Sequence, residues 1–243
     1  GEIKDFKKGL IPILLPVALI CGLILPADFS TAAILFTVCF TMMFIGGAKI
    51  KHLGSIIGTA FLGFAFLILV NIAVPGFLPR VDTWEKRMMS FGSGEKQENY
   101  QAEMAKRAVA NGFLFGKGPG KGHVKNDLYS AQSDFIYASS IEEFGSIIGG
   151  IGLVILYMIL FFRAIRIMNK VDSKFASFVV FGLSFMLIFQ SFINMGVGVN
   201  LFPVTGQPLP LISMGGTSIL FTCISLGIIL NVSTTVYKDS ENV

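Results

Sequence analysis

The sequence predicts an all-α polytopic membrane protein with about six transmembrane helices and a long, partly helical extracytoplasmic loop. Hydrophobic residues make up 53% of the chain and charged residues only 14%, and the mean hydropathy is +0.72. In soluble domains about a quarter of the residues are charged, so this composition indicates a chain that is solvated by lipid. Its apolar runs are continuous rather than alternating, which predicts helices and not the strands of a membrane barrel.

Six apolar runs are long enough to cross roughly 30 Å of hydrocarbon. They lie at about 9–27, 31–48, 54–78, 136–162, 175–198 and 209–232. Pro75 interrupts the third run near its end. The predicted organisation is a single membrane domain: three transmembrane helices in 1–75, an extracytoplasmic loop in 76–133, and three helices with a cytoplasmic tail in 134–243.

The basic residues of the short connections set the orientation of these helices. One side of the membrane receives Lys4, Lys7, Lys8, Lys49, Lys51, Arg163, Arg166, Lys170, Lys174 and Lys238. The short loops on the other side, Pro26–Ser30 and Val199–Pro208, carry no Lys or Arg. The positive-inside rule therefore predicts that both ends of the chain are cytoplasmic and that loop 76–133 is outside.

The polar content of the apolar runs excludes one class of membrane protein. The middle of every run lacks Asp, Glu, Lys, Arg and His, and its main polar groups are Gln190 and Asn194. Ion-coupled transporters usually carry ionisable groups within their spans, so an ion-coupled pump is disfavoured. Cys21, Cys39 and Cys223 all lie in apolar runs, where packing explains them better than a disulfide or a metal site.

The long loop contains one segment with the pattern of an amphipathic helix. This segment begins near Ser93, carries Tyr100, Met104 and Ala108 at a spacing of four, and ends near Gly112. Such spacing places the three side chains on one face. Structureless loops beyond about 15 residues are uncommon, so we expect this loop to be folded on the surface.

Residues 115–125, FGKGPGKGHVK, form a basic glycine-rich segment. Its backbone N–H groups, with Lys117, Lys121 and Lys125, could bind an anion. The spacing is not that of a Walker A loop, because no Ser or Thr follows Lys117. A flexible basic loop at an anionic membrane surface is the alternative, and the lone His123 is a poor candidate for metal binding or catalysis.

Three acids stand at the entrance of the fourth apolar run. A helix from Asp134 to Phe162 would contain 29 residues and measure about 43 Å, which exceeds the bilayer core. Placing Glu142 or Glu143 at the bilayer centre would cost about 2.5–3.5 kcal/mol each, so we expect the excess helix and its acids on the outer side. They would not form one carboxylate pair, because they project in different directions. The simpler alternatives are that Asp134 caps the helix beside Ser133 and that both glutamates are satisfied by neighbouring helices.

Together these features favour a site for an amphiphilic anion. An acid at headgroup level, a basic glycine loop and flanking apolar helices suit a lipid-linked phosphate compound. Its chain would lie in the bilayer, its phosphate at the basic loop and its headgroup near Asp134.

Three blocks of the sequence resemble the SEDS family of bacterial cell-wall polymerases, which includes FtsW, RodA and SpoVE. The blocks are LPADFSTAAILF (25–36), the series from Tyr100-Gln101 through GKGPG (116–120) to SDFIYASSIEEFG (133–145), and NMGVGVNLFPVTGQPLPLISMGGTS (194–218). GKGPG is most similar to the FtsW branch. In two places the chain departs from the family pattern: Ser30 replaces a glycine, and LYSAQS (128–133) lacks the acid or imidazole often found beside the aspartate. Members have about ten spans and this chain resembles the last six, so we expect further spans before residue 1.

The resemblance implies a peptidoglycan glycosyltransferase that polymerises lipid II in septal cell-wall synthesis. Asp134 would be the general base for the acceptor 4-hydroxyl. Implied contacts to the pyrophosphate are Arg107, Lys117 and Lys121, and residues implied to shape the cavity are Arg87, Gln101, Glu142, Glu143 and Ser213. No cofactor is assigned and no metal ligand is identified, although a divalent cation such as Mg²⁺ could help to bind the pyrophosphate.

The implied partners are lipid II, a class B penicillin-binding protein acting as transpeptidase, and membrane lipids, with no nucleic acid. The implied location is the bacterial inner membrane. A lipid II flippase and a non-catalytic scaffold that recruits the transpeptidase are the alternatives. A flippase needs a continuous polar path between helices, which the charge-free spans of this chain do not supply.

Overall fold

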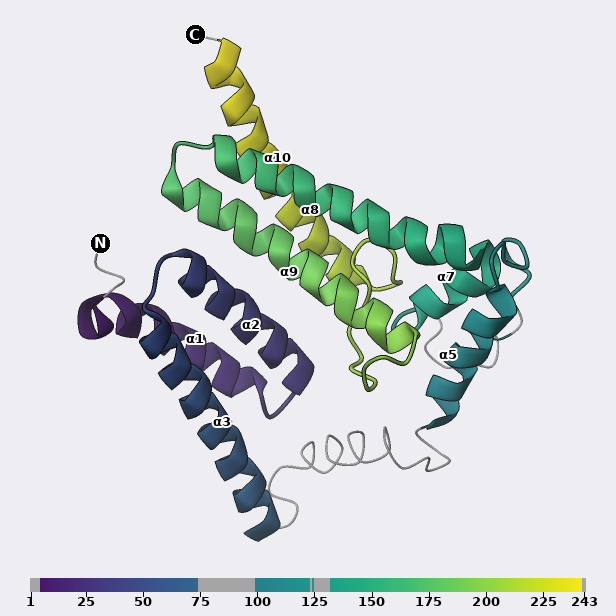
Figure 1. The fold of residues 1–243 in the computed structure, drawn as a ribbon, viewed down its shortest axis with the longest axis horizontal. Helices are drawn as coiled ribbons and strands as arrows, with labels where there is room; N and C mark the ends of the chain where they lie inside the picture. Colours follow the sequence, from purple (N-terminus) through teal and green to yellow (C-terminus); the bar gives the residue numbers. More distant parts are fainter. Residues whose placement is uncertain (1–4, 74–98, 123, 125–131, 242–243) are drawn as a thin grey trace. The chain divides into compact units, whose positions relative to one another are not determined.

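The computed structural model describes residues 5–73, 99–122, 124 and 132–241. These residues form helices and no strands, in agreement with the predicted fold class (Figure 1). Each of the six predicted apolar segments contains a helix. The chain divides into two compact units, Gly1–Met89 and Ser90–Val243, which are described separately. The predicted single membrane domain therefore stays a prediction.

The described part of the first unit contains three apolar helices preceded by a short π-helical turn. These elements are η2 (Phe6–Leu10), α1 (Ile11–Ile24), α2 (Phe29–Ile45) and α3 (Ile50–Ala73). A small core of Leu10, Met43, Ala48, Leu53 and Ile56 holds them together. Many other apolar side chains are exposed, which is the pattern expected of helices that contact lipid. The expected extension of the third helix to residue 78 lies outside the described residues.

Asp28 fixes the start of α2. Its Oδ1 accepts hydrogen bonds from the backbone N–H groups of Ser30 (2.9 Å) and Thr31 (3.2 Å), and its Oδ2 accepts one from Thr31 Oγ1 at 2.5 Å. This is the arrangement of an N-cap, which satisfies amides that have no partner within the helix. The first sequence block is therefore a capped turn between two apolar helices.

The second unit is built on a long helical hairpin. Its elements are α5 (Asn99–Gly112), α7 (Ile136–Gly145), η3 (Ser146–Gly152), α8 (Leu153–Lys170), α9 (Lys174–Gly198) and α10 (Gly216–Glu241). Helices α8 and α9 lie side by side, with the ring of Phe161 against those of Phe181 and Phe185 (Figure 1). Helix α10 packs on the pair through a cluster that includes Val180 and Ile229.

Within the described residues, four helical stretches have the length and hydropathy of membrane spans: Ile50–Asn71, Ile136–Lys170, Lys174–Gly198 and Gly216–Thr235. Helices α1 and α2 are apolar but shorter, with 14 and 17 residues. The last span was expected at 209–232 and begins at Gly216 instead, because Leu209 to Ser213 form a turn. The helix then continues to Glu241, where a tail was predicted.

The fourth apolar run is not the single straight helix that the sequence suggested. Gly145 has φ +80° and ψ 168°, and this conformation ends α7 and turns the chain. Tyr137 Oη donates a hydrogen bond to Gly150 O at 3.2 Å, whereas a straight helix would separate these residues by about 20 Å. Helix α7 therefore folds back against η3, and Figure 1 shows it beside the end of α8.

The amphipathic helix of the long loop is confirmed as α5, over Asn99–Gly112, and its predicted start near Ser93 lies outside the described residues. Met104 and Ala108 are buried, as the spacing predicted, and they pack with Ala105 against Phe135 and Ala138 of the α7 region. Tyr100, expected on the same face, is exposed instead. This packing attaches the described part of the loop to one end of the α8–α9 hairpin.

Candidate functional site

Asp134 lies in a turn, residues 132–135, directly before α7. Its side chain is half-buried, and Ser133 Oγ donates a hydrogen bond to its Oδ1 at 2.8 Å. The N-cap position of α7 belongs to Phe135 and no side chain caps this helix, so the capping alternative for Asp134 is not realised. The Asp134 Oδ2 faces Gly206, where an added Cβ would lie 4.0 Å away.

Asn194 of α9 holds the backbone of this turn. Its Nδ2 donates to Asp134 O at 2.9 Å and to Gln207 O at 2.7 Å, and its side chain is almost fully buried. The two donors of one amide group thus join the Asp134 turn to loop 199–215. Sequence reasoning noted Asn194 only as a polar group inside a span, and its role depends on contacts that no local pattern encodes.

Ser213 completes the attachment from the other side of the loop. Its Oγ donates to Ser133 O at 2.6 Å and accepts from Leu209 N at 2.7 Å. Met214 N also donates to Gln132 O at 2.8 Å. The structure therefore brings together two predicted site residues, Asp134 and Ser213, although through the backbone of Ser133 and not by direct contact.

Further polar groups fix loop 199–215 to the helical hairpin. Gln190 Nε2 of α9 donates to Pro208 O at 3.1 Å. Tyr157 Oη of α8 donates to Pro210 O through a short hydrogen bond. Because these contacts anchor consecutive parts of the loop, the surroundings of Asp134 rest on rigid helices rather than on mobile chain.

Glu142 lies near the other end of α7 and is fully buried. Its Oε1 is 3.4 Å from Lys117 Nζ and accepts a hydrogen bond from Asn111 Nδ2 at 3.3 Å. Its Oε2 accepts from Val124 N at 3.2 Å. The predicted residues Lys117 and Glu142 are thus paired with each other, about eight residues and some 12 Å of helical rise from Asp134.

The glycine-rich segment is docked on α7 through its backbone. Lys117 N donates to Glu142 O and Gly118 N to Glu143 O, both at 2.9 Å. These two amides are therefore engaged within the protein. Lys121 is exposed on the same segment, and its backbone N–H donates to Gly118 O at 3.1 Å.

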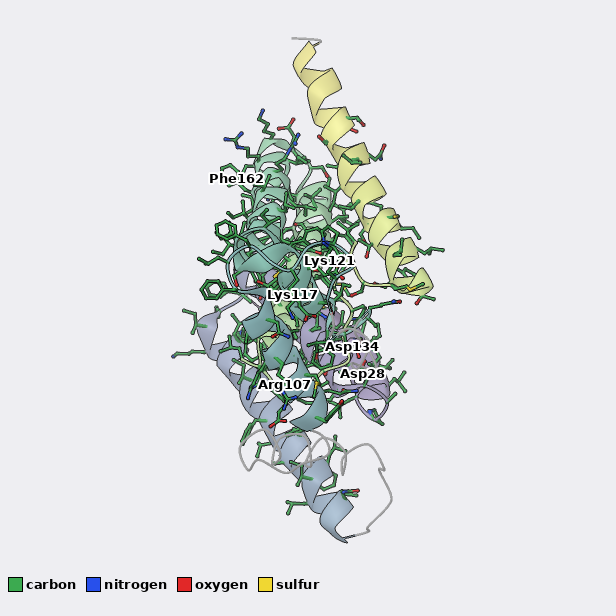
Figure 2. The ribbon with its side chains drawn as sticks, turned by 90° about the vertical axis from the view of Figure 1, so that its right-hand side faces the viewer. Asp28, Arg107, Lys117, Lys121, Asp134 and Phe162 are labelled. Atoms are coloured by element: carbon green, nitrogen blue, oxygen red, sulfur yellow. The ribbon has the colours of Figure 1, made fainter. Side chains whose placement is uncertain are left out.

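The remaining predicted residues are less closely placed. Arg107 of α5 is exposed and Gln101 and Glu143 are half-buried. Figure 2 shows Lys117 and Lys121 beyond the C-terminal end of α5, with Arg107 along that helix and Asp134 on a separate segment. Arg87 and His123 lie outside the described residues.

The described residues offer limited material for a metal site. Among them, no three His, Cys, Asp or Glu side chains converge. Mg²⁺ commonly uses one or two carboxylates together with substrate phosphates, and Asp134 is a half-buried carboxylate with one oxygen that accepts no hydrogen bond from the described residues. A divalent cation stays a prediction, and no step proposed below passes through one.

The fold and these contacts define a polytopic membrane protein with a polar site at one end of a helical hairpin. A family model described as "Cell cycle protein", for FtsW, RodA and SpoVE, matches residues 2–238. The chain therefore belongs to the FtsW/RodA/SpoVE family.

Curated relatives agree with this assignment. The chain is 33% identical to a probable peptidoglycan glycosyltransferase FtsW of Francisella salina, over 95% of this chain and 57% of the relative. It is also 33% identical to stage V sporulation protein E of Bacillus subtilis, over 96% of this chain and 62% of the relative. The chain thus spans about 60% of the length of these two relatives.

Solved structures share the fold. One, titled "Structural coordination of polymerization and crosslinking by a peptidoglycan synthase complex", matches 97% of this chain and 64% of its own, with a TM-score of 0.67 and 26% identity. A mutant of the rod shape determining protein RodA of Thermus thermophilus covers 97% of this chain and 61% of its own, with a TM-score of 0.57 and 23% identity. The latter likeness concerns the fold alone.

Proposed function

We propose that this chain forms part of a peptidoglycan glycosyltransferase that polymerises lipid II during septal cell-wall synthesis. Family membership and relatives named peptidoglycan glycosyltransferase FtsW support the activity. The observation that carries the proposal is the setting of Asp134. This carboxylate is half-buried, and side chains hold the backbone on both of its sides. Asn194 donates to the carbonyl of Asp134, and Ser213 donates to the carbonyl of Ser133.

Asp134 is the proposed general base. It takes the proton of the acceptor GlcNAc 4-hydroxyl while that oxygen attacks C1 of the donor MurNAc. The bond from C1 to the pyrophosphate oxygen breaks, and undecaprenyl pyrophosphate leaves with the electron pair and with inversion at C1. The hydrogen bond from Ser133 to Oδ1 orients the carboxylate and leaves Oδ2 to accept the proton.

Two cationic residues, Lys121 and Arg107, are proposed to bind the pyrophosphate. Lys121 and Arg107 are exposed and bear charges that complement phosphate. Lys117, also predicted for this role, lies 3.4 Å from the buried carboxylate of Glu142. Arg87, Gln101 and the other predicted cavity residues keep their proposed supporting role.

The proposed topology places the α8–α9 turn in the cytoplasm and the Asp134 site outside. Lys170 and Lys174 flank that turn, and Asn194 lies near the opposite end of α9. The 25 residues of α9 span about 37 Å, enough to separate the two ends across an inner membrane. A class B penicillin-binding protein is the proposed partner, because one similar structure is titled as a complex that coordinates polymerization and crosslinking.

The experiment compares Asp134→Asn with wild type in the full-length protein, purified with its transpeptidase and supplied with lipid II. Loss of a general base costs roughly 10²–10⁴-fold in rate, so glycan polymer should fall by that factor. Asp172→Asn is the matched control, because Asp172 is an exposed aspartate in the α8–α9 turn. Polymer at the wild-type rate from Asp134→Asn would overturn the general-base assignment.

The same preparation separates the alternatives. Translocation of lipid II across vesicles by the wild-type protein, without any polymer, would favour a flippase. Recruitment of the transpeptidase with neither polymer nor translocation would favour a scaffold.

A further inference from the structure

The buried carboxylate of Glu142 is the centre of a cluster that the proposed reaction does not use. Asn111 comes from the last turn of α5, whereas Lys117 and Val124 come from the two ends of the glycine-rich segment, yet all three donate to this one side chain. A buried charge is tolerated only when it is paired and hydrogen-bonded. The cluster therefore holds three separate parts of the chain at one point on α7.

Backbone contacts extend this attachment along the same surface. Lys117 N and Gly118 N donate to the last carbonyls of α7, and Ser146 N donates to Phe113 O at 2.8 Å. Gly122 lies so close to the cluster that an added Cβ would stand 2.9 Å from Glu142 Oε2. The segment is thus held against α7 by backbone hydrogen bonds, and the Glu142 carboxylate lies between the segment and α7.

We propose that Glu142 is a positioning residue that clamps residues 113–122 and Val124, here called the glycine loop, onto the C-terminal turn of α7. Lys117 is the cation of this clamp and does not contact the substrate. Lys121, exposed on the glycine loop, is then left to contact the pyrophosphate. This inference rests on the proposed function only for the role of Lys121, because the clamp itself is a feature of the folded chain.

The clamp has a consequence for kinetics. If it orients Lys121, releasing the glycine loop raises KM for lipid II while Asp134 and its supporting groups keep their places. A merely structural defect would instead lower the active fraction, which reduces the apparent kcat and leaves KM unchanged.

The first arm measures hydrogen exchange in the full-length protein in detergent. Amides of Lys117, Gly118 and Val124 should exchange at least about tenfold faster in Glu142→Gln, which keeps the side-chain volume but loses the charge. Glu103→Gln is the matched control, because Glu103 is an exposed acid on α5. Unchanged exchange in Glu142→Gln would overturn the clamp.

The second arm tests the assignment of Lys117 against that of Lys121. Lys117→Met should speed exchange of the glycine loop as Glu142→Gln does, and the two changes together should cause little more than either alone. Lys121→Met should raise KM without changing exchange. If Lys117→Met raises KM and leaves exchange unchanged, Lys117 is a substrate contact and the proposal fails.

The two proposals fail in different ways. Absence of polymer from the wild-type protein would count against the proposed function, whereas the exchange arm would still decide the clamp. Should Glu142→Gln not fold, Lys117→Met decides the same question, because it removes the other half of the pair.

Discussion

The two ends of α7 carry acids in opposite environments. Asp134, just before the helix, is half-buried, and among the described residues the donor to its carboxylate is Ser133 Oγ. Glu142, in the last turn, is fully buried and accepts from Lys117, Asn111 and Val124. One carboxylate has an oxygen left for chemistry, and the other is engaged by protein groups.

The supporting contacts differ in the same sense. At the Asp134 end the neighbouring side chains bind backbone carbonyls, as Asn194 and Ser213 do, so the carboxylate itself is left accessible. At the Glu142 end the neighbours bind the carboxylate. The difference between the two acids is therefore in their hydrogen bonds. The Asp134 carboxylate keeps an oxygen for a substrate proton, whereas the Glu142 carboxylate binds other parts of the protein.

The largest effect is expected where the turn beyond the Glu142 end is broken. Gly145→Ala would force a Cβ into a conformation that is essentially restricted to glycine, and place it 2.2 Å from Leu114 O. We expect a loss of about 3 kcal/mol or more in unfolding free energy, because strain and overlap add. Thermal unfolding in detergent measures this loss.

Gly152→Ala is the control for that change. A Cβ at Gly152 would meet its nearest neighbour, Ile147 O, at an ordinary 3.5 Å. Alanine is the better helix former, so this variant should unfold at or above the wild-type temperature. Equal stability of the two alanine variants would show that the chain does not turn at Gly145.

An intermediate effect is expected from loosening the Asp134 end. Asn194→Ala leaves the carbonyls of Asp134 and Gln207 without their donor, which should cost about 2 kcal/mol of unfolding free energy. Polymerisation should fall as well, because the base loses its support. Asn169→Ala is the control, because Asn169 is exposed near the C-terminal end of α8, away from the Asp134 turn. When both variants are measured together, this change should alter neither the unfolding free energy nor the polymerisation rate.

The smallest effect should come from Ser133, whose hydroxyl donates to the Asp134 carboxylate. Ser133→Ala removes the donor at 2.8 Å, and we expect less than about a tenfold loss of polymerisation rate, since a net hydrogen bond contributes about 1 kcal/mol. Ser133→Thr keeps the hydroxyl and should restore most of the rate. A loss as large as that of Asp134→Asn would make Ser133 part of the chemistry, and the contrast between the two ends would need revision.

The sequence by itself determined the helices. Apolar runs of bilayer length became α1, α2, α3, α8, α9 and α10, because backbone groups in lipid must pair within their own segment. The spacing of Met104 and Ala108 predicted the buried face of α5. Asp134 and Ser213 were also found as candidates, through the motifs that contain them.

Only the tertiary structure decided how these pieces meet. Hydropathy cannot distinguish a straight helix from one that turns back at Gly145, because both satisfy their backbone groups and have the same composition. Glu142 was predicted as an acid that shapes the cavity. Its ion pair with Lys117 was not predicted, because it forms only when the chain folds back and brings the two residues together. The roles of Asn194 and Asn111 depend on partners 60 and 31 residues away, and such contacts exist only once the chain has folded.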